Sequence, residues 1–244
     1  SLNQKIDELS LISRYSEELI ARVDRMDVIS CLFETVRRYF PLDIIGFLLP
    51  KKRFHDFLLW SRTALHDEDV QRVCSEVVAE YNRDAPSPIQ LRRVKVLPMG
   101  APDDDTAARG PVQCAFSHII PVQWEDVQFG ITYFGAMQEP SEKEGIISLL
   151  KSLVNQTRIA LTSTKLYDDV KENYIRTIKA LAIAVDAKDT YTHGHSENVM
   201  IIAEAIATEM NMDEKIIGII RDAGLLHDIG KIGIPRSEER RVGK

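Results

Sequence analysis

The pattern of apolar and polar residues predicts a helical start, a mixed middle and a helical end. In the first forty residues apolar side chains recur at helical spacing, and Asp27 is a suitable N-cap for the second of two helices. The segments LDIIGFLLP (42–50) and DFLLWSR (56–62) are typical of strands joined by a polar turn. A further helix is predicted where six residues follow the spacing i, i+3, i+4, i+7, i+8, i+11: Val70, Val73, Cys74, Val77, Val78 and Tyr81.

Strand patterns then return before a long helix. After a stretch rich in Pro and Asp, LRRVKVL (91–97) is a strand candidate, and VQCAFSHIIPVQ (112–123) and VQFGITYFGAM (127–137) flank a three-residue turn, as in a hairpin. A helical pattern runs from residue 142 to residue 189, and after Gly145 neither Gly nor Pro interrupts it. The order of elements predicts an α+β domain followed by a long linker helix into an all-α region.

Composition narrows the class of protein. The apolar content of 44% and charged content of 28% are those of a soluble globular protein. No apolar run approaches the roughly 18 residues that span a bilayer, so we expect no membrane segment. The chain begins with Ser1 rather than Met, which suggests a fragment. Cys31, Cys74 and Cys114 are odd in number and widely separated, which indicates a reducing, cytoplasmic setting and argues against disulfides or a Cys-type zinc site.

The charge distribution bears on possible partners. The net charge is −6, and residues 236–244 contribute +2, which leaves −8 for residues 1–235. An acidic body repels the phosphate backbone, so we expect no nucleic acid partner.

The order helix, two strands, helix, strand, hairpin and exit helix resembles a GAF domain over residues 10–165, and a PAS domain is similar at this level. The resemblance implies an antiparallel sheet that cups a small ligand on one face, with helices on the other. The ligand is unknown, because no ligand-specific residue set can be identified. Cys114 as a chromophore attachment point and His118 as a haem ligand are less favoured than a small buried hydrophobe and a satisfied core or surface residue.

Two later segments carry candidate chemistry, AVDAKDTYTHGHSENV (184–199) and AGLLHDIGKIGIP (223–235). His195 opens a helical pattern, and His227 occupies the next position on the apolar face of a following helix. The expected apolar stripe of the first helix is Val199, Ile202, Ala203 and Ile206, and that of the second is Ile216, Ile217, Ile220, Ala223 and Gly224.

The adjacent pair His227 and Asp228 is suited to binding metal ions. The imidazole can bind one metal while the two carboxylate oxygens bridge a pair, and mixed nitrogen and oxygen donors suit iron, manganese or another first-row ion. Lys231 lies four residues after His227, on the same face if the helix continues, where its cation could neutralise a substrate phosphate.

The motifs YTHGHS and LLHDIGKIGIP make residues 171–235 similar to the N-terminal part of an HD-GYP domain, a branch of the HD phosphohydrolases that hydrolyses cyclic di-GMP. The resemblance implies that His195, His227 and Asp228 bind a divalent metal pair, with Asp228 as the bridging ligand. It further implies catalytic roles for Asp228 and for Lys231, which would contact the substrate phosphate. Water activated by the two cations would attack the phosphodiester.

The resemblance is incomplete in several places. His193 matches no ligand position and is interpreted as a loop residue, while Asp186 and Asn198 stand where the family often has Glu and Arg. In the family, the sequence continues with a further His, a His-His pair, a Gly-Tyr-Pro loop and an Asp near the end of the domain. In this chain the similarity to the family stops at Pro235. The segment RSEERRVGK (236–244) is expected to be a non-native tail, and the alternative is a basic interaction tail.

Together these features predict a bacterial signalling protein in which a GAF-type sensor regulates a cyclic di-GMP phosphodiesterase. The 244-residue chain itself is expected to bind metal weakly and to lack turnover, because three protein ligands cannot hold two octahedral ions. Two alternatives remain open: a non-enzymatic regulator with a degenerate HD domain, and another HD phosphohydrolase that acts on nucleotides.

The linker helix, residues 142–189, overlaps both regions and is expected to transmit the signal, with a homodimer as a possible assembly. One seven-residue register supports this dimer, although its alternate positions Thr157, Thr164 and Lys171 are polar. The register consists of Leu153, Ala160, Tyr167, Tyr174 and Leu181.

Overall fold

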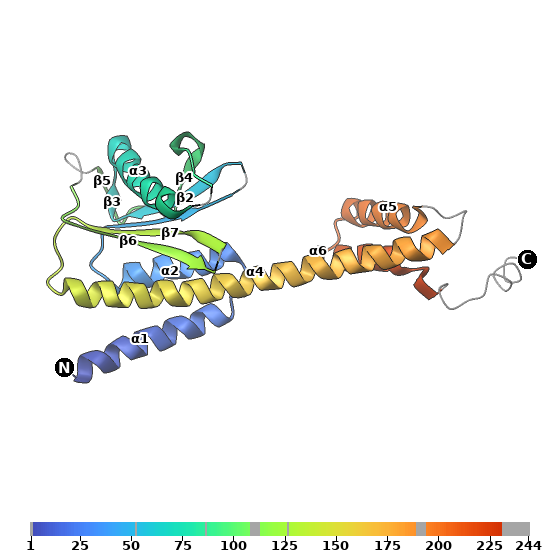
Figure 1. The fold of residues 1–244 in the computed structure, drawn as a ribbon, viewed down its shortest axis with the longest axis horizontal. Helices are drawn as coiled ribbons and strands as arrows, with labels where there is room; N and C mark the ends of the chain where they lie inside the picture. Colours follow the sequence, from blue (N-terminus) through green and yellow to red (C-terminus); the bar gives the residue numbers. More distant parts are fainter. Residues whose placement is uncertain are drawn as a thin grey trace, which may run out of the picture. The chain divides into compact units, whose positions relative to one another are not determined.

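The structure, a computed structural model, describes residues 2–51, 53–85, 87–107, 113–125, 127–188 and 194–230. By its internal contacts the chain divides into an N-terminal unit, Ser1–Leu166, and a C-terminal unit, Tyr167–Lys244. Within the described ranges, no helix combines the length and apolar character needed to cross a bilayer. The elements in chain order (Figure 1) are α1 (Leu2–Ile20), α2 (Arg25–Tyr39), β1 (Ile44–Leu49), β2 (His55–Ser61), β3 (Thr63–Ala64), α3 (Asp67–Asp84), β4 (Val94–Pro98), β5 (Asp104–Ala107), β6 (Phe116–Trp124), β7 (Val127–Ala136), α4 (Lys143–Lys188), α5 (His195–Glu209) and α6 (Glu214–Leu226).

The N-terminal unit is built on a five-stranded sheet with the strand order β4-β2-β1-β7-β6. Strand β1 pairs antiparallel with β2 and β7, and β6 pairs antiparallel with β7, which confirms the mixed α+β class and the predicted hairpin. The expectation of a purely antiparallel sheet is wrong at one edge, because β4 runs parallel to β2. The chain crosses over from β2 to β4 through α3, and such a crossover returns it in the same direction.

Helices cover both faces of this sheet, with α3 on one side and α2 and α4 on the other (Figure 1). Strand β1 is therefore buried along its whole length, which explains why it is a continuous apolar run rather than an alternating one. Successive residues along a strand point to opposite faces of the sheet. Phe47, Trp60 and Phe134 belong to the core between the sheet and helices α2 and α4.

The face of the sheet that α3 covers carries a second apolar core. Its central members are Phe57 and Tyr133 on the sheet and Val73, Cys74 and Val77 on α3. Burial raises the pKa of the Cys74 thiol to about 11, and burial likewise raises the pKa of Cys114. A protonated thiol is a poor nucleophile. These surroundings therefore favour the interpretation of both cysteines as small apolar residues that pack in the core.

The predicted cap of the second helix is wrong by one turn. Helix α2 begins at Arg25, and the side chain of Asp24 accepts hydrogen bonds from the backbone amides of Met26 and Asp27 at 2.7 and 3.4 Å. Asp27 lies in the first turn, where its charge still interacts favourably with the helix dipole. The strand predicted at 91–97 also shortens, because its first three residues form a 3₁₀ turn, Leu91–Arg93.

The first part of α4 packs on the core of its own unit. Leu153 and Thr157 are fully buried, and the Thr157 hydroxyl shares a 2.6 Å hydrogen bond with the hydroxyl of Tyr15 on α1. A polar residue at this register position therefore connects two helices of the N-terminal unit. Tyr167 and Tyr174, farther along α4, are exposed, and the homodimer stays a prediction.

His118 on β6 differs from the satisfied residue that the sequence suggested. Its Nε2 atom is buried and has no hydrogen-bond partner among the residues that the structure describes. Burial and the nearby cation of Lys151 both lower the pKa of His118 below its usual value of 6.5. The folded chain therefore disfavours protonation of this imidazole.

This environment predicts a loss of stability in mild acid. Because the pKa of His118 is lower in the folded chain, the unfolded chain binds more protons, and the free energy of unfolding should fall as the pH drops below about 6.5. His118→Gln should make this fall shallower, as measured by urea unfolding between pH 5 and 7. His55, whose pKa is also lowered by burial, accounts for a remaining slope. An unchanged slope in the variant would contradict the prediction.

Candidate metal centre

Helices α5 and α6 place the His and Asp side chains of the two motifs at one end of a helical pair. Helix α5 starts at His195, directly after Gly194, whose φ of 76° lies in the left-handed region that favours glycine. The carbonyl of Gly194 accepts a hydrogen bond from the amide of Asn198 at 3.0 Å, which anchors the first turn. His195 is thereby presented at the N-terminal end of the helix.

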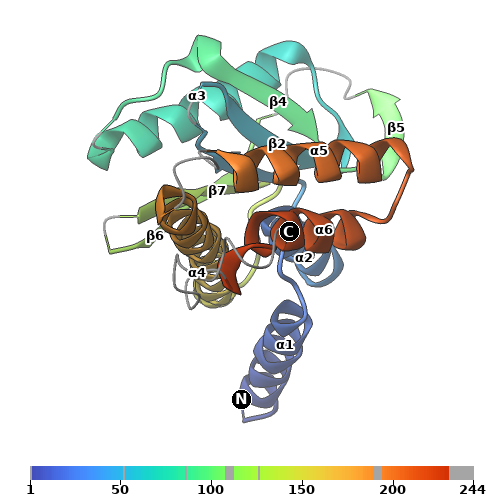
Figure 2. The ribbon, with the colours of Figure 1, turned by 90° about the vertical axis from the view of Figure 1, so that its right-hand side faces the viewer.

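The two helices lie side by side and approach closely (Figure 2). A Cβ atom on Gly224 of α6 would meet the Cα atom of Met200 on α5 at 3.1 Å, so glycine permits this spacing. Met200 and Leu225 are buried together with Ile178 of α4. This small core orients the end of α6, where the His-Asp pair follows.

The buried face of α5 differs from the predicted stripe. Ile202 and Ile206 are exposed, whereas Met200 and Ala207 are buried. On α6, Ile216 of the predicted stripe is exposed as well. Helical periodicity identified the helices correctly, and Gly224 of the predicted α6 stripe does lie in the contact with α5. On α5, however, the buried residues are not those of the predicted stripe.

Three side chains meet just beyond the end of α6. The Nε2 atoms of His227 and His195 lie 3.3 and 3.9 Å from the same oxygen, Oδ2 of Asp228. The centroids of the two imidazole rings are 5.1 Å apart, and the ring planes are inclined to each other by 65°. One potential ligand atom from each residue falls within 4.8 Å of the others, and all three side chains are partly open to solvent. The arrangement brings two imidazoles and one carboxylate onto a common point.

A backbone contact orients one of these imidazoles. Nδ1 of His227 lies 2.8 Å from the carbonyl oxygen of Gly224, a distance at which a protonated Nδ1 donates a hydrogen bond. That tautomer leaves the lone pair of Nε2 directed toward Asp228 and free for a metal ion. Metal-binding histidines commonly donate their other ring N–H in this way. Gly224 was not identified as a functional residue from the sequence, although its position three residues before His227 is compatible with this contact.

The donor set fits a first-row divalent ion. Two imidazole nitrogens and a carboxylate oxygen suit iron, manganese or zinc better than the all-oxygen set preferred by magnesium and calcium. Among the described residues, His195, His227 and Asp228 are the group that meets the spacing for a metal ion. The structure thus brings together all three predicted metal ligands.

The other residues singled out from the sequence contribute less to the described site. Lys231 and His193 lie outside the described residues, as does the segment 236–244. Asp186 belongs to α4, but its side chain is not among those described. Asn198 lies in the first turn of α5 and is exposed.

Comparison with known proteins finds similarities in this region. Residues 192–244 match the family described as the HD domain. The chain is 35% identical over 89 residues to a cyclic di-GMP phosphodiesterase of Thermotoga maritima, which covers 36% of this chain and 24% of that protein. It is 30% identical over 114 residues to the 3'3'-cGAMP-specific phosphodiesterase 2 of Vibrio cholerae, which covers 47% of this chain and 22% of that protein.

A third similarity extends farther along the chain. A cyclic di-GMP phosphodiesterase of Pseudomonas aeruginosa is 25% identical over 185 residues, which covers 72% of this chain and 41% of that protein. The chain therefore spans less than half the length of each of these relatives. Its C-terminal part matches the HD domain, and His195, His227 and Asp228 all lie within the matched residues.

Proposed function

We propose that this chain is part of a metal-dependent phosphodiesterase that acts on cyclic di-GMP or a related cyclic dinucleotide. The convergence of His195, His227 and Asp228 within 4.8 Å, inside the HD domain match, carries the proposal. The names of three similar proteins, two of them cyclic di-GMP phosphodiesterases and one specific for 3'3'-cGAMP, support the substrate class.

The proposed roles follow from the donor atoms. His195 and His227 would bind a divalent metal pair, iron or manganese, through Nε2, and Asp228 would bridge it. Metals bound here supply Lewis-acid activation of water and of the phosphodiester. The carbonyl of Gly224 holds the His227 ring in its orientation. Lys231 would contact a substrate phosphate through its cation.

The proposal includes regulation by the N-terminal unit. A GAF-type sensor with an unidentified ligand would act on the HD domain through α4, which runs without interruption from Lys143 to Lys188. A homodimer through this helix belongs to the same proposal, and exposed apolar residues on α4 support it: Leu166, Tyr167, Val170, Tyr174 and Leu181. Sedimentation of the chain as a monomer would contradict the dimer.

Hydrolysis assays test the enzymatic part. We expect no turnover of cyclic di-GMP by the 244-residue chain with Mn²⁺ or Fe²⁺, because three protein ligands do not satisfy two octahedral ions. Because the chain spans less than half the length of these relatives, the test also uses a protein that contains residues 1–235 and has the length of such a relative. That protein should hydrolyse the substrate, and Asp228→Asn in it should abolish activity.

The matched control is Asp222→Asn, the same change on a partly exposed carboxylate of α6. Turnover by the 244-residue chain would show that its three ligands suffice. If the protein with the length of a relative binds metal but hydrolyses no cyclic dinucleotide, the proposed function is overturned in favour of a regulator or of an HD phosphohydrolase with other nucleotide substrates.

A further inference from the structure

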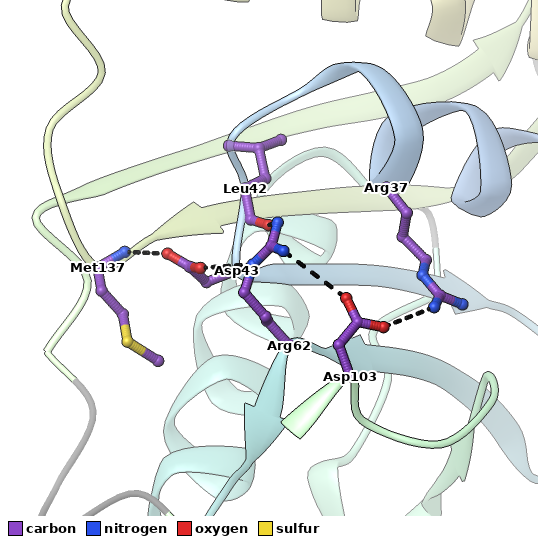
Figure 3. Close-up of polar contacts among 6 residues, drawn as sticks. All are labelled: Arg37, Leu42, Asp43, Arg62, Asp103 and Met137. Atoms are coloured by element: carbon purple, nitrogen blue, oxygen red, sulfur yellow. Dashed lines mark hydrogen bonds and ion pairs between the residues drawn. The ribbon is translucent and has the colours of Figure 1, made fainter. Parts of the chain in front are cut away.

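A network of charged side chains lies at the end of the sheet where the chain leaves it for α4 (Figure 3). Asp43, just before β1, accepts hydrogen bonds from Nε of Arg62 at 3.1 Å and from the backbone amide of Met137 at 2.8 Å. Arg62 also donates through Nη2 to the carbonyl of Leu42 at 3.0 Å. Two of the three guanidinium nitrogens of Arg62 are therefore held by the two residues that directly precede β1.

The remaining nitrogen of Arg62 faces a second carboxylate. Nη1 of Arg62 lies 3.7 Å from Oδ2 of Asp103, while Nη2 of Arg37 on α2 donates to Oδ1 of the same residue at 2.8 Å. The two oxygens of one carboxylate thus lie against two arginines that come from different elements (Figure 3). All three side chains are about one-third to two-fifths exposed, so solvent reaches the site.

An aromatic ring completes this arrangement. The guanidinium of Arg37 lies 4.6 Å from the centroid of the Trp60 ring, and that of Arg62 lies 5.9 Å from it. Trp60 itself is 1% exposed, so its ring is held in place by the core and both guanidinium groups can pack against it. Its indole N–H is buried and has no hydrogen-bond partner within the described part of the chain. Such a group is rare in folded proteins, and an unseen water or ion is one explanation for it.

We propose that Arg37, Arg62 and Trp60 form a binding site for a small carboxylate, which Asp103 of the same chain occupies in this structure. Both arginines are positioned by contacts that do not depend on Asp103, namely the Trp60 ring, Asp43 and the Leu42 carbonyl. Partly exposed ion pairs contribute only about 0–1 kcal/mol, so an external carboxylate can compete with Asp103. Without Asp103, the group of Arg37, Arg62 and Asp43 carries one net positive charge, which favours an anion.

The site is connected to the start of α4. Arg62 contacts the proposed ligand and Asp43, and Asp43 holds the amide of Met137, which precedes the first residue of α4 by six positions. A ligand that shifts Arg62 therefore acts on the segment that leads into this helix. This inference concerns the N-terminal unit and is independent of the proposed phosphodiesterase function.

The fluorescence of Trp60 tests the proposal in the full chain. A Trp124→Phe background leaves Trp60 as the single tryptophan. Sodium acetate is titrated against sodium chloride at constant ionic strength. Asp103→Asn should show a saturable response, and its half-saturating acetate concentration should be several-fold lower than that of the chain with Asp103, because the tethered carboxylate no longer competes for the two arginines. Adding Arg37→Gln to this variant should abolish the response.

The control is Arg83→Gln, which removes an arginine from an exposed pair with Glu80 and should leave acetate binding unchanged. Circular dichroism confirms that each variant is folded. If Asp103→Asn does not fold, the chain with Asp103 is titrated at higher acetate, and Arg37→Gln must abolish that response. Absence of saturation, or saturation that survives Arg37→Gln, would overturn the proposal. A response to inorganic phosphate as strong as that to acetate would contradict the assignment to carboxylates.

Discussion

Replacing Asp228 with Asn is expected to weaken Mn²⁺ binding to the chain by at least about 100-fold. Loss of a partner outside the ligand shell typically costs 10–100-fold in metal affinity, and Asp228 is itself the negatively charged ligand of the group. Its Oδ2 atom is the point on which Nε2 of His195 and Nε2 of His227 both converge. Asparagine preserves the shape of the side chain but removes the charge that offsets the charge of the cation. Calorimetric titration with Mn²⁺ measures the change directly.

The control for this experiment is Asp222→Asn, the same substitution on α6, where the carboxylate pairs with Arg221 rather than with the histidines. We expect its Mn²⁺ affinity to equal that of the unsubstituted chain. Equal losses in both variants would indicate nonspecific attraction of the cation to an acidic surface. An Mn²⁺ affinity of Asp228→Asn equal to that of the unsubstituted chain would contradict the metal centre, and with it the proposed function.

Gly130→Ala is expected to destabilise the N-terminal unit by about 3 kcal/mol, the range of severe overpacking. A Cβ atom at this position of β7 would lie 2.2 Å from the carbonyl oxygen of Leu48 and 2.6 Å from the Phe47 ring. Phe47 can adjust, but the Leu48 carbonyl belongs to the backbone of the neighbouring central strand, β1. Relief of the clash therefore requires displacement of the ladder between β1 and β7. Urea unfolding of the two chains gives the difference in the free energy of unfolding.

Gly145→Ala provides the matched control. This glycine lies in the first turns of α4, and a Cβ atom there would meet no other atom within 4 Å. Alanine favours the helix over glycine by up to about 1 kcal/mol, so this variant should be neutral or slightly more stable. Comparable destabilisation by both substitutions would show that the tight approach of β1 and β7 is not the cause.

Much of the secondary structure could be predicted because it depends on local patterns. The helix at Asp67–Asp84 and the strands at Ile44–Leu49 and His55–Ser61 follow from apolar spacing, and the structure confirms them. The direction of β4 could not be predicted in this way. Its parallel pairing with β2 depends on the path of the whole crossover and not on the residues of the strand itself.

The buried faces of the C-terminal helices show a similar limit. Periodicity placed Ile202 and Ile206 on an inner face, yet both are exposed, and Met200 and Ala207 are buried instead. Apolar residues of α5 lie on more than one side of the helix, so the sequence pattern allows more than one face to be buried. The close contact with Gly224 on α6 selects one of them, and that contact exists only in the folded unit.

By itself the sequence predicted which residues of this protein form the candidate metal centre. The adjacent pair His227 and Asp228 was singled out from its donor atoms, and the resemblance of two short motifs to an HD-GYP domain added His195 to the predicted set. Only the tertiary structure decided that their ligand atoms lie within 4.8 Å and that the Gly224 carbonyl orients His227. The tertiary structure alone also placed Asp103 against Arg37 and Arg62. Asp103 and Arg37 are 66 positions apart in the sequence. Such contacts arise from packing between segments that are distant in the sequence, so no local sequence pattern predicts them.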